Sequence, residues 1–310
     1  MWDQLHILDY VKVTIYERAG SATEVGAAIN IGPNGVKILE MLGFDRQRVG
    51  SLPVKGMRFW NKEGSIVKEN SCEFQKDYGA DWLFNHRADL REEFIRLATA
   101  DSKDLGGVLG LENGDAVYAD LIVAADGIKS TIRPLIVGDA AFTTAKPSGM
   151  SAFRFTVPRA SFEQSAYPFP TVLESFDGMA TIDMIFAQDG TQRSVVMYPC
   201  RSFQLLNFVC IASDSFLRTA TTESWSASGD KEELLEIFKD FPSWALEYIG
   251  LASDIKLWQL RDQDPLPSYC LGRTVLIGDA AHPMTPHQGQ GGTQTVEDAE
   301  GFRLFTAEGI

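Results

Sequence analysis

The sequence predicts an α/β protein in which a parallel sheet is interrupted by a second, antiparallel β domain. The first observation is a set of short apolar segments without clean alternation, which is typical of strands buried on both faces of a parallel sheet. The second is an acidic residue at the carboxyl end of each of these segments. The third is a later stretch in which β-rich segments follow one another with turns between them.

Three segments carry the parallel-sheet pattern: residues 11–16, 121–125 and 274–277. Glu17 and Asp126 follow the first two directly, and Asp279 follows the third after one glycine. Because ligands of open α/β sheets bind at the carboxyl ends of the strands, the three acids are candidates for one ligand site. For each acid alone, capping of the turn or helix that follows explains the pattern better.

Helices are predicted between these strands. Residues 34–42 place apolar side chains on one face and stop at Gly43. Residues 89–100 and 230–238 each open with Asp-x-x-Glu, which resembles a capping box. Strands alternating with helices favour the layered arrangement of a nucleotide-binding domain.

The pattern changes in the middle of the chain, where four segments look like antiparallel strands: residues 151–157, 180–186, 194–198 and 205–212. Asp189-Gly190, between the second and third of them, suits a hairpin turn. The α/β pattern returns after residues 256–260. The sequence therefore predicts a discontinuous domain of residues 1–150 and 265–310, and a substrate domain of residues 151–264.

The composition is that of an acidic globular protein. Lys and Arg number 28 against 42 Asp and Glu, a net charge of −14, which argues against a nucleic-acid surface or an anchor on an acidic membrane leaflet. Four widely spaced cysteines predict a reducing compartment rather than a disulfide framework: Cys72, Cys200, Cys210 and Cys270. Without a membrane-length apolar run or a secretory signal, we expect a cytoplasmic protein.

The segment that says most about function is residues 273–298, RTVLIGDAAHPMTPHQGQGGTQTVED. A strand ends at Gly278-Asp279, a turn with two prolines follows, and Gly291 and Gly292 lead into a helix. Glycines let a ligand approach the backbone, and the N–H groups of a helix start favour negative charge. A plain strand–turn–helix connection explains these glycines less well than a ligand does.

This segment closely resembles the GD motif of class A FAD-dependent aromatic monooxygenases, the salicylate-hydroxylase-like family. Residues 120–133, DLIVAADGIKSTIR, resemble the DG motif of the family, which binds FAD and the nicotinamide cofactor. Further similar segments are Tyr16-Glu17-Arg18, residues 24–29, 32–34, 85–90 (NHRADL), 198–201 (YPCR) and 206–209 (LNFV). The resemblance covers nearly all of residues 11–310.

The resemblance implies a Rossmann-like FAD-binding domain, and an enzyme that hydroxylates a phenolic, aromatic or polyketide-like small molecule with NAD(P)H and O2. It implies contacts to FAD from seven positions: Glu17, Ala28, Arg87, Asp126, Asp279, Gly291 and Gly292. A glutamate at a strand end accepts hydrogen bonds from ribose hydroxyls, and an arginine offsets the charge of the diphosphate. The helix start at the two glycines would stabilise the anion formed when the flavin is reduced.

Arg154 and Tyr198 lie on predicted strands of the substrate domain. Arg154 could orient a phenolate by its charge and Tyr198 by a hydrogen bond, which makes the two residues the catalytic candidates. Packing in the core or at the surface accounts for both residues at least as well.

The chain departs from the family at its first strand. Family members begin with a strand and a G-x-G-x-x-G turn that approaches the diphosphate, whereas residues 1–10 contain no glycine. By the usual length of that βαβ unit, the chain starts about thirty residues late. We therefore expect a truncated FAD-binding domain that lacks its first, central strand.

Other functions stay open at this point. A degenerate family member that binds no FAD would be a pseudoenzyme or a non-redox cyclase or isomerase. An NAD-dependent dehydrogenase is disfavoured because the chain lacks both the fingerprint and a second nucleotide site. His282 and His287 do not predict zinc, because no cysteine is near and both lie inside the flavin-type motif. A serine hydrolase is disfavoured because no G-x-S-x-G occurs.

Overall fold

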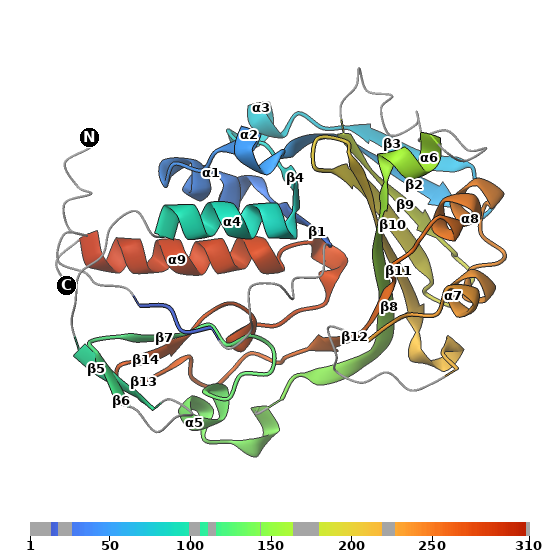
Figure 1. The fold of residues 1–310 in the computed structure, drawn as a ribbon. Helices are drawn as coiled ribbons and strands as arrows, with labels where there is room; N and C mark the ends of the chain where they lie inside the picture. Colours follow the sequence, from blue (N-terminus) through green and yellow to red (C-terminus); the bar gives the residue numbers. More distant parts are fainter. Residues whose placement is uncertain are drawn as a thin grey trace. The chain divides into compact units, whose positions relative to one another are not determined.

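The structure, a computed structural model, describes residues 14–17, 27–98, 106–110, 116–142, 144–163, 180–218 and 227–307. Contacts divide the chain into two compact units, each described here by itself (Figure 1). The sheet unit comprises Glu24–Glu93 and Pro147–Leu260. The motif unit comprises Met1–Thr23, Phe94–Lys146 and Arg261–Ile310. The predicted domains divide the chain by function, and their boundaries stay a prediction.

The sheet unit is built on one large mixed sheet, which curls strongly in Figure 1. Its strands follow in the order β1 (Ala28–Ile31), β4 (Leu83–His86), β2 (Leu52–Asn61), β9 (Ala180–Phe186), β10 (Ser194–Cys200), β11 (Leu205–Ser213), β8 (Lys146–Pro158) and β12 (Lys256–Asp262). A further strand, β3 (Ile66–Ser71), pairs with β2. The strands from β9 through β10 and β11 to β8 are antiparallel, whereas β2 and β9 run parallel.

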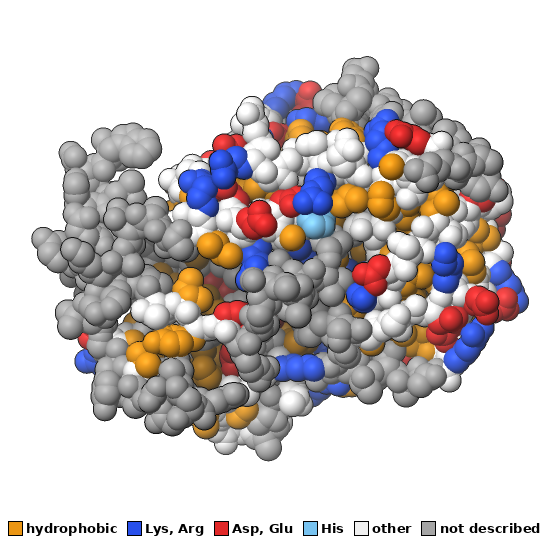
Figure 2. Space-filling model, viewed as in Figure 1, with side chains coloured by type: hydrophobic (Ala, Val, Ile, Leu, Met, Phe, Trp, Pro, Cys, Tyr) orange, Lys and Arg blue, Asp and Glu red, His pale blue; other side chains and the backbone are white. Residues whose placement is uncertain are grey.

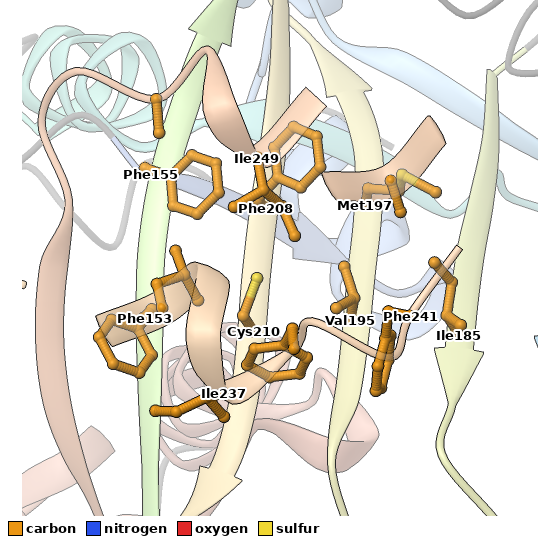
Figure 3. Packing of buried hydrophobic residues seen from close by; sticks show 14 of the residues in the cluster. Phe153, Phe155, Ile185, Val195, Met197, Phe208, Cys210, Ile237, Phe241 and Ile249 are labelled. Carbon is orange, nitrogen blue, oxygen red and sulfur yellow. The ribbon is translucent and has the colours of Figure 1, made fainter. Parts of the chain in front are cut away.

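One face of this sheet packs against short helices: α6 (Arg159–Glu163), α7 (Lys231–Ile237) and α8 (Ser243–Gly250). Phe155 of β8 and Phe208 of β11 lie in this core, with their rings stacked at a centroid distance of 4.9 Å. Figure 3 shows these rings among side chains from the neighbouring strands and helices. Since side chains alternate along a strand, Arg154 and Asn207 project from the opposite face.

The opposite face holds a second apolar cluster, in which the rings of Phe84 and Tyr198 stack 4.5 Å apart. The remaining helices of this unit are α1 (Pro33–Met41), α2 (Arg46–Val49), α3 (Phe74–Tyr78), η4 (Asp214–Phe216) and the start of α4 (Arg87–Ala98). Pro33 suits the first position of α1, where a missing N–H costs no helical bond. Asp45 caps α2, since its carboxylate accepts from the Gln47 N–H at 2.9 Å.

The motif unit contains a small sheet in the order β13 (Cys270–Leu271), β14 (Thr274–Leu276) and β7 (Ile122–Ala124), with β7 and β14 parallel. The strands β5 (Gly106–Gly110) and β6 (Ala116–Ala119) form a separate pair. The helices are α5 (Arg133–Val137), η2 (Ala140–Phe142), η5 (Gly278–Ala280), η6 (Pro286–Gln288) and α9 (Gly291–Ala307). Ala124 and Leu276 are buried against α5, whereas Val123 of β7 is 43% exposed.

Most predicted elements are confirmed. The two late parallel strands form β7 and β14, and the four middle segments form β8 to β11. Asp230 caps α7 as predicted, because its carboxylate accepts from the Glu233 N–H at 2.7 Å. The structure adds β1, β2 and β4 to the large sheet, which therefore takes strands from both sides of residue 150.

Two predictions of local structure are wrong. Residues 14–16 of the first predicted strand are exposed and have no strand assignment, while residues 11–13 lie outside the described residues. An apolar β-rich pattern becomes a strand only where a neighbouring strand accepts its hydrogen bonds. The helix expected from Asp89 begins instead at Arg87, so Asp89 lies in its first turn and accepts a hydrogen bond from Arg201 at 2.7 Å.

The face drawn in Figure 2 carries charges of both signs. On the face drawn in Figure 2, positive and negative side chains of the described residues are interspersed rather than gathered by sign. In the part of the chain that the structure describes, no helix has the length and apolarity to cross a membrane.

Removal of a ring from the helix-covered core should destabilise the protein strongly. Phe208 is fully buried, so Phe208→Ala should lower the free energy of unfolding by about 3–5 kcal/mol through lost burial and a residual cavity. Leu135, at 72% exposure, is the control, and Leu135→Ala should change that value by less than about 0.5 kcal/mol. Urea unfolding followed by tryptophan fluorescence measures both. Equal effects of the two substitutions would contradict the packing described.

Candidate functional site

In the sheet unit, Arg154 on β8 is fixed on two sides. Its Nη2 donates a hydrogen bond to the Ala28 carbonyl oxygen at 3.1 Å, and its Cζ lies 4.3 Å from the centre of the Trp258 ring. Its Nε is buried and has no hydrogen-bond partner among the described residues. Burial lowers the pKa of Arg154 to about 10, with Tyr198 opposing and Arg87 adding to this effect. Arg154 therefore stays a cation at neutral pH.

Tyr198 on β10 is a buried phenol beside this cation. Burial raises its pKa to about 12, although nearby positive charge and a hydrogen bond with Asn30 act in the opposite direction. The hydroxyl therefore keeps its proton at neutral pH and can donate it in a hydrogen bond. The structure thus brings together Ala28, Arg87, Arg154 and Tyr198, four of the predicted site residues, within one unit.

Asn207 on β11 completes this group, and the sequence analysis did not single it out. It is fully buried, and its Oδ1 accepts from the Ala28 N–H at 3.1 Å. Its Nδ2 has no partner among the described residues. The sequence feature that could have identified Asn207 is its position as a lone amide in the apolar strand LLNFVCIAS, because a buried polar side chain in such a strand needs a specific partner.

Arg87 is placed by the junction of β4 and α4. Its backbone N–H donates to the Ala27 carbonyl at 3.1 Å, so the helix start is tied to the strand that carries Ala28. The side chain is half-buried, and its charge contributes to lowering the pKa of Arg154. Two cations close enough to influence one another favour a negatively charged ligand here.

In the motif unit, the carboxylate of Asp126 shapes its own turn. It accepts hydrogen bonds from the Ser130 hydroxyl at 2.6 Å and from the Thr131 and Ile132 N–H groups at 2.7 Å and 3.3 Å. Burial raises the pKa of Asp126, but these hydrogen bonds outweigh burial and hold the pKa below its ordinary value. Both carboxylate oxygens are thus engaged locally, in keeping with the capping interpretation.

Arg133 joins the two motif loops, and sequence analysis did not single it out. Its side chain is fully buried; Nε donates to the Ala280 carbonyl at 2.6 Å and Nη2 to the Asp279 carbonyl at 2.8 Å. On the other side, Nη1 donates to the Ile128 carbonyl at 3.2 Å. One guanidinium therefore holds the GD loop against the DG loop. The sequence feature that could have identified Arg133 is its place as the last residue of the DG motif.

The GD turn is held from its other end by α9. Asp298 Oδ2 accepts from the Gly278 N–H and lies 2.8 Å from Nε2 of His282. Gly278 has a φ of +55°, and a Cβ there would approach the Thr295 hydroxyl oxygen to 3.2 Å, so the turn requires glycine. These contacts place Asp279, half-buried, at the end of β14.

Gly291 and Gly292 form the start of α9, where the first helical hydrogen bond runs from the Gln294 N–H to the Gln290 carbonyl at 2.8 Å. N–H groups of a first helical turn have no helical acceptor, and two residues without side chains leave them accessible. A helix start of this kind fits an anionic or electron-rich group. Glu17 lies in the same unit, exposed in a stretch without strand assignment.

The His282–Asp298 pair should make the protein sensitive to pH. The hydrogen bond that the His282 ring donates to the Asp298 carboxylate raises the pKa of His282, outweighing burial. The stabilisation of the folded protein by the His282–Asp298 pair is complete below the unfolded-state pKa of histidine, about 6.5. It is lost as pH rises through the higher pKa of His282 in the folded protein. His282→Gln should therefore lower the melting temperature most near pH 6, and the decrease relative to the parent protein should become smaller as pH rises. Thermal melts across pH measure this difference.

The control for this series is His287→Gln, which removes an exposed histidine from the same segment. It should lower the melting temperature little at any pH. A His282→Gln penalty that is constant with pH would contradict the role of the ion pair.

Known proteins are similar to this chain in sequence and in fold. A family profile described as "FAD binding domain" matches residues 96–304. Hispidin-3-hydroxylase of Neonothopanus nambi is 29% identical over 96% of this chain and 75% of its own length. The FAD-dependent monooxygenase phomE' of Diaporthe leptostromiformis is 30% identical over 93% of this chain and 76% of its own length.

Solved structures have the same fold. The structure of CtdE with FAD and a substrate has a TM-score of 0.77 at 19% identity, covering 96% of this chain and 74% of that one. A salicylate hydroxylase substrate complex has a TM-score of 0.72 at 24% identity, covering 91% and 72%. The predicted fold class, a Rossmann-like FAD domain with a β substrate domain, is thereby confirmed. The chain belongs to the class A FAD-dependent monooxygenases, the salicylate-hydroxylase-like family that its GD and DG motifs resemble.

Proposed function

We propose that this protein is an FAD-dependent monooxygenase that hydroxylates a phenolic, aromatic or polyketide-like small molecule. In the balanced reaction, ring C–H, O2, NAD(P)H and a proton give ring C–OH, water and NAD(P)+. The observation that carries the proposal is the pair of loops joined by Arg133, because it fixes the GD turn and the DG turn of a flavin-binding motif against each other. The family of the chain supports the same reaction.

Each unit, taken by itself, offers groups that suit part of an FAD molecule. In the motif unit, the first turn of α9 offers backbone N–H groups at Gly291 and Gly292. In the sheet unit, Arg87 offers a cation that suits a diphosphate. Asp279 would accept from hydroxyl groups of the ribityl chain, Glu17 from the adenosine ribose, and Ala28 would line the cofactor. Asp126 would contribute by holding the DG turn in shape, since its carboxylate is engaged there. Bound FAD would supply the redox chemistry, accepting a hydride from NAD(P)H and activating O2.

We propose that the substrate binds on the face of the large sheet that carries Arg154 and Tyr198, opposite the helix-covered core. Arg154 stays charged and Tyr198 stays protonated at neutral pH, so one can stabilise a phenolate and the other can donate a hydrogen bond to it. The stacked rings of Phe84 and Tyr198 are buried in the apolar cluster on this face of the sheet. The alternative, a degenerate member without FAD, rests on the absence of glycine from residues 1–10, whereas the FAD-dependent relatives favour the monooxygenase.

FAD retention tests the assignment of the cofactor residues. Arg87→Ala and Asp279→Ala should each raise the dissociation constant of FAD about tenfold or more, since a hydrogen bond to a charged group contributes about 1.5–3 kcal/mol. Asp279→Ala leaves the backbone carbonyl that Arg133 binds in place, so the loop should persist. Flavin fluorescence during titration measures the affinity.

Matched controls come from exposed charges outside the site. Arg273→Ala and Asp254→Ala remove side chains that are 71% and 73% exposed, and both should leave FAD affinity within about twofold of the parent. If Arg87→Ala and Asp279→Ala also kept the parent affinity, the assignment of these two residues would be wrong. With FAD bound, a phenolic substrate should stimulate NAD(P)H oxidation and gain one oxygen atom by mass spectrometry.

A further inference from the structure

Two side chains from neighbouring strands hold the backbone of a single residue. Arg154 of β8 donates to the Ala28 carbonyl, and Asn207 of β11 accepts from the Ala28 N–H, each at 3.1 Å. In the register of β8 and β11, Arg154 lies opposite Val209 and Asn207 lies opposite Thr156. Arg154 and Asn207 are therefore diagonal neighbours on the same face of the sheet.

Each of these side chains keeps one buried donor without a partner. The atoms are Nε of Arg154 and Nδ2 of Asn207, and neither has a hydrogen-bond acceptor among the described residues. A buried donor left unsatisfied is unfavourable, and native proteins contain few of them. Two such donors on diagonal positions, with Nη2 of Arg154 and Oδ1 of Asn207 bound to Ala28, indicate a place where a ligand supplies the acceptor.

The charge of the group selects the kind of acceptor. No carboxylate among the described residues pairs with Arg154, and Arg87 adds a second positive charge to its surroundings. The Trp258 ring covers the guanidinium plane, which fixes its orientation. An anionic oxygen would satisfy both donors and balance the charge, whereas a neutral carbonyl would satisfy only the donors.

We propose that Nε of Arg154 and Nδ2 of Asn207 together bind one anionic oxygen of an aromatic substrate, a ring phenolate or carboxylate. This inference rests on the proposed function and makes Asn207 a specificity-determining residue. The stacked Phe84 and Tyr198 rings lie in the apolar cluster on the same face of the sheet. The pair selects for ionised substrates, because a neutral ring would leave the guanidinium without a counter-charge.

The test uses 4-nitrophenol as the probe, because its visible absorption band reports ionisation directly. Difference spectra of the full chain loaded with FAD give both the affinity for the probe and its apparent pKa when bound. Bound to the parent protein, 4-nitrophenol should ionise at lower pH than in solution. Nitrobenzene, which has no anionic oxygen, should bind at least about tenfold more weakly, the equivalent of one strong hydrogen-bonded contact.

Two substitutions remove the proposed donors. Asn207→Asp keeps an oxygen for the Ala28 N–H but replaces the Nδ2 donor by an acceptor. Arg154→Lys keeps the positive charge but loses Nε, together with the Nη2 bond to the Ala28 carbonyl. Each should weaken binding of the nitrophenolate about tenfold or more. Thr156→Val, on the same face of β8 and opposite Asn207, is the matched control and should stay within about twofold.

FAD affinity, measured on the same variants, separates this inference from its alternatives. Nitrophenolate binding lost with FAD affinity unchanged supports the proposal. Unchanged probe binding in both variants overturns it and would mean that water satisfies the donors. A loss of FAD affinity with probe binding retained also overturns it, because the donors would then serve the cofactor. Failure of the proposed function looks different, since the parent chain itself would then bind no FAD.

Discussion

The alternation of side chains along a strand is the constraint on which the site depends. Along β8 and β11 every second residue enters the helix-covered core, so the residues between them must face the other way. The core takes Phe155 and Phe208, and the same register sends Arg154 and Asn207 to the opposite face. A shift of one residue would bury the guanidinium among phenylalanine rings. The large apolar core therefore fixes the polar group on the other face, and stability and site geometry share one cause.

The motif unit is held together in a different way, because a buried arginine side chain, rather than a large apolar core, joins its loops. Arg133 satisfies carbonyl groups from two loops that are about 150 residues apart in the sequence. Asp298 fixes the same GD turn from the side of α9. Loops held by side chains at both ends are suited to present backbone groups to a cofactor, because they lose little further freedom on binding.

Sequence patterns predicted those helices, strands and turns that depend on residues close together in the chain. The β-rich segments around Asp189-Gly190 became the middle strands of the large sheet, and the segment after residue 273 became a strand, a turn and α9. The missed features depend on partners distant in sequence. Asn207 matters because the Ala28 N–H reaches it, and Arg133 because two loops meet on it. Residues 14–16 show the converse, since this β-rich stretch has no strand assignment in the structure.

Binding of FAD by the GD and DG loops and the start of α9 is tested most directly by the visible absorption spectrum of the protein. The purified chain is incubated with excess FAD, separated by gel filtration and examined beside a circular dichroism spectrum. We expect a flavin band near one FAD per chain, because the α9 start and the loops held by Arg133 fit the cofactor. A folded but colourless protein would show that these residues do not bind FAD.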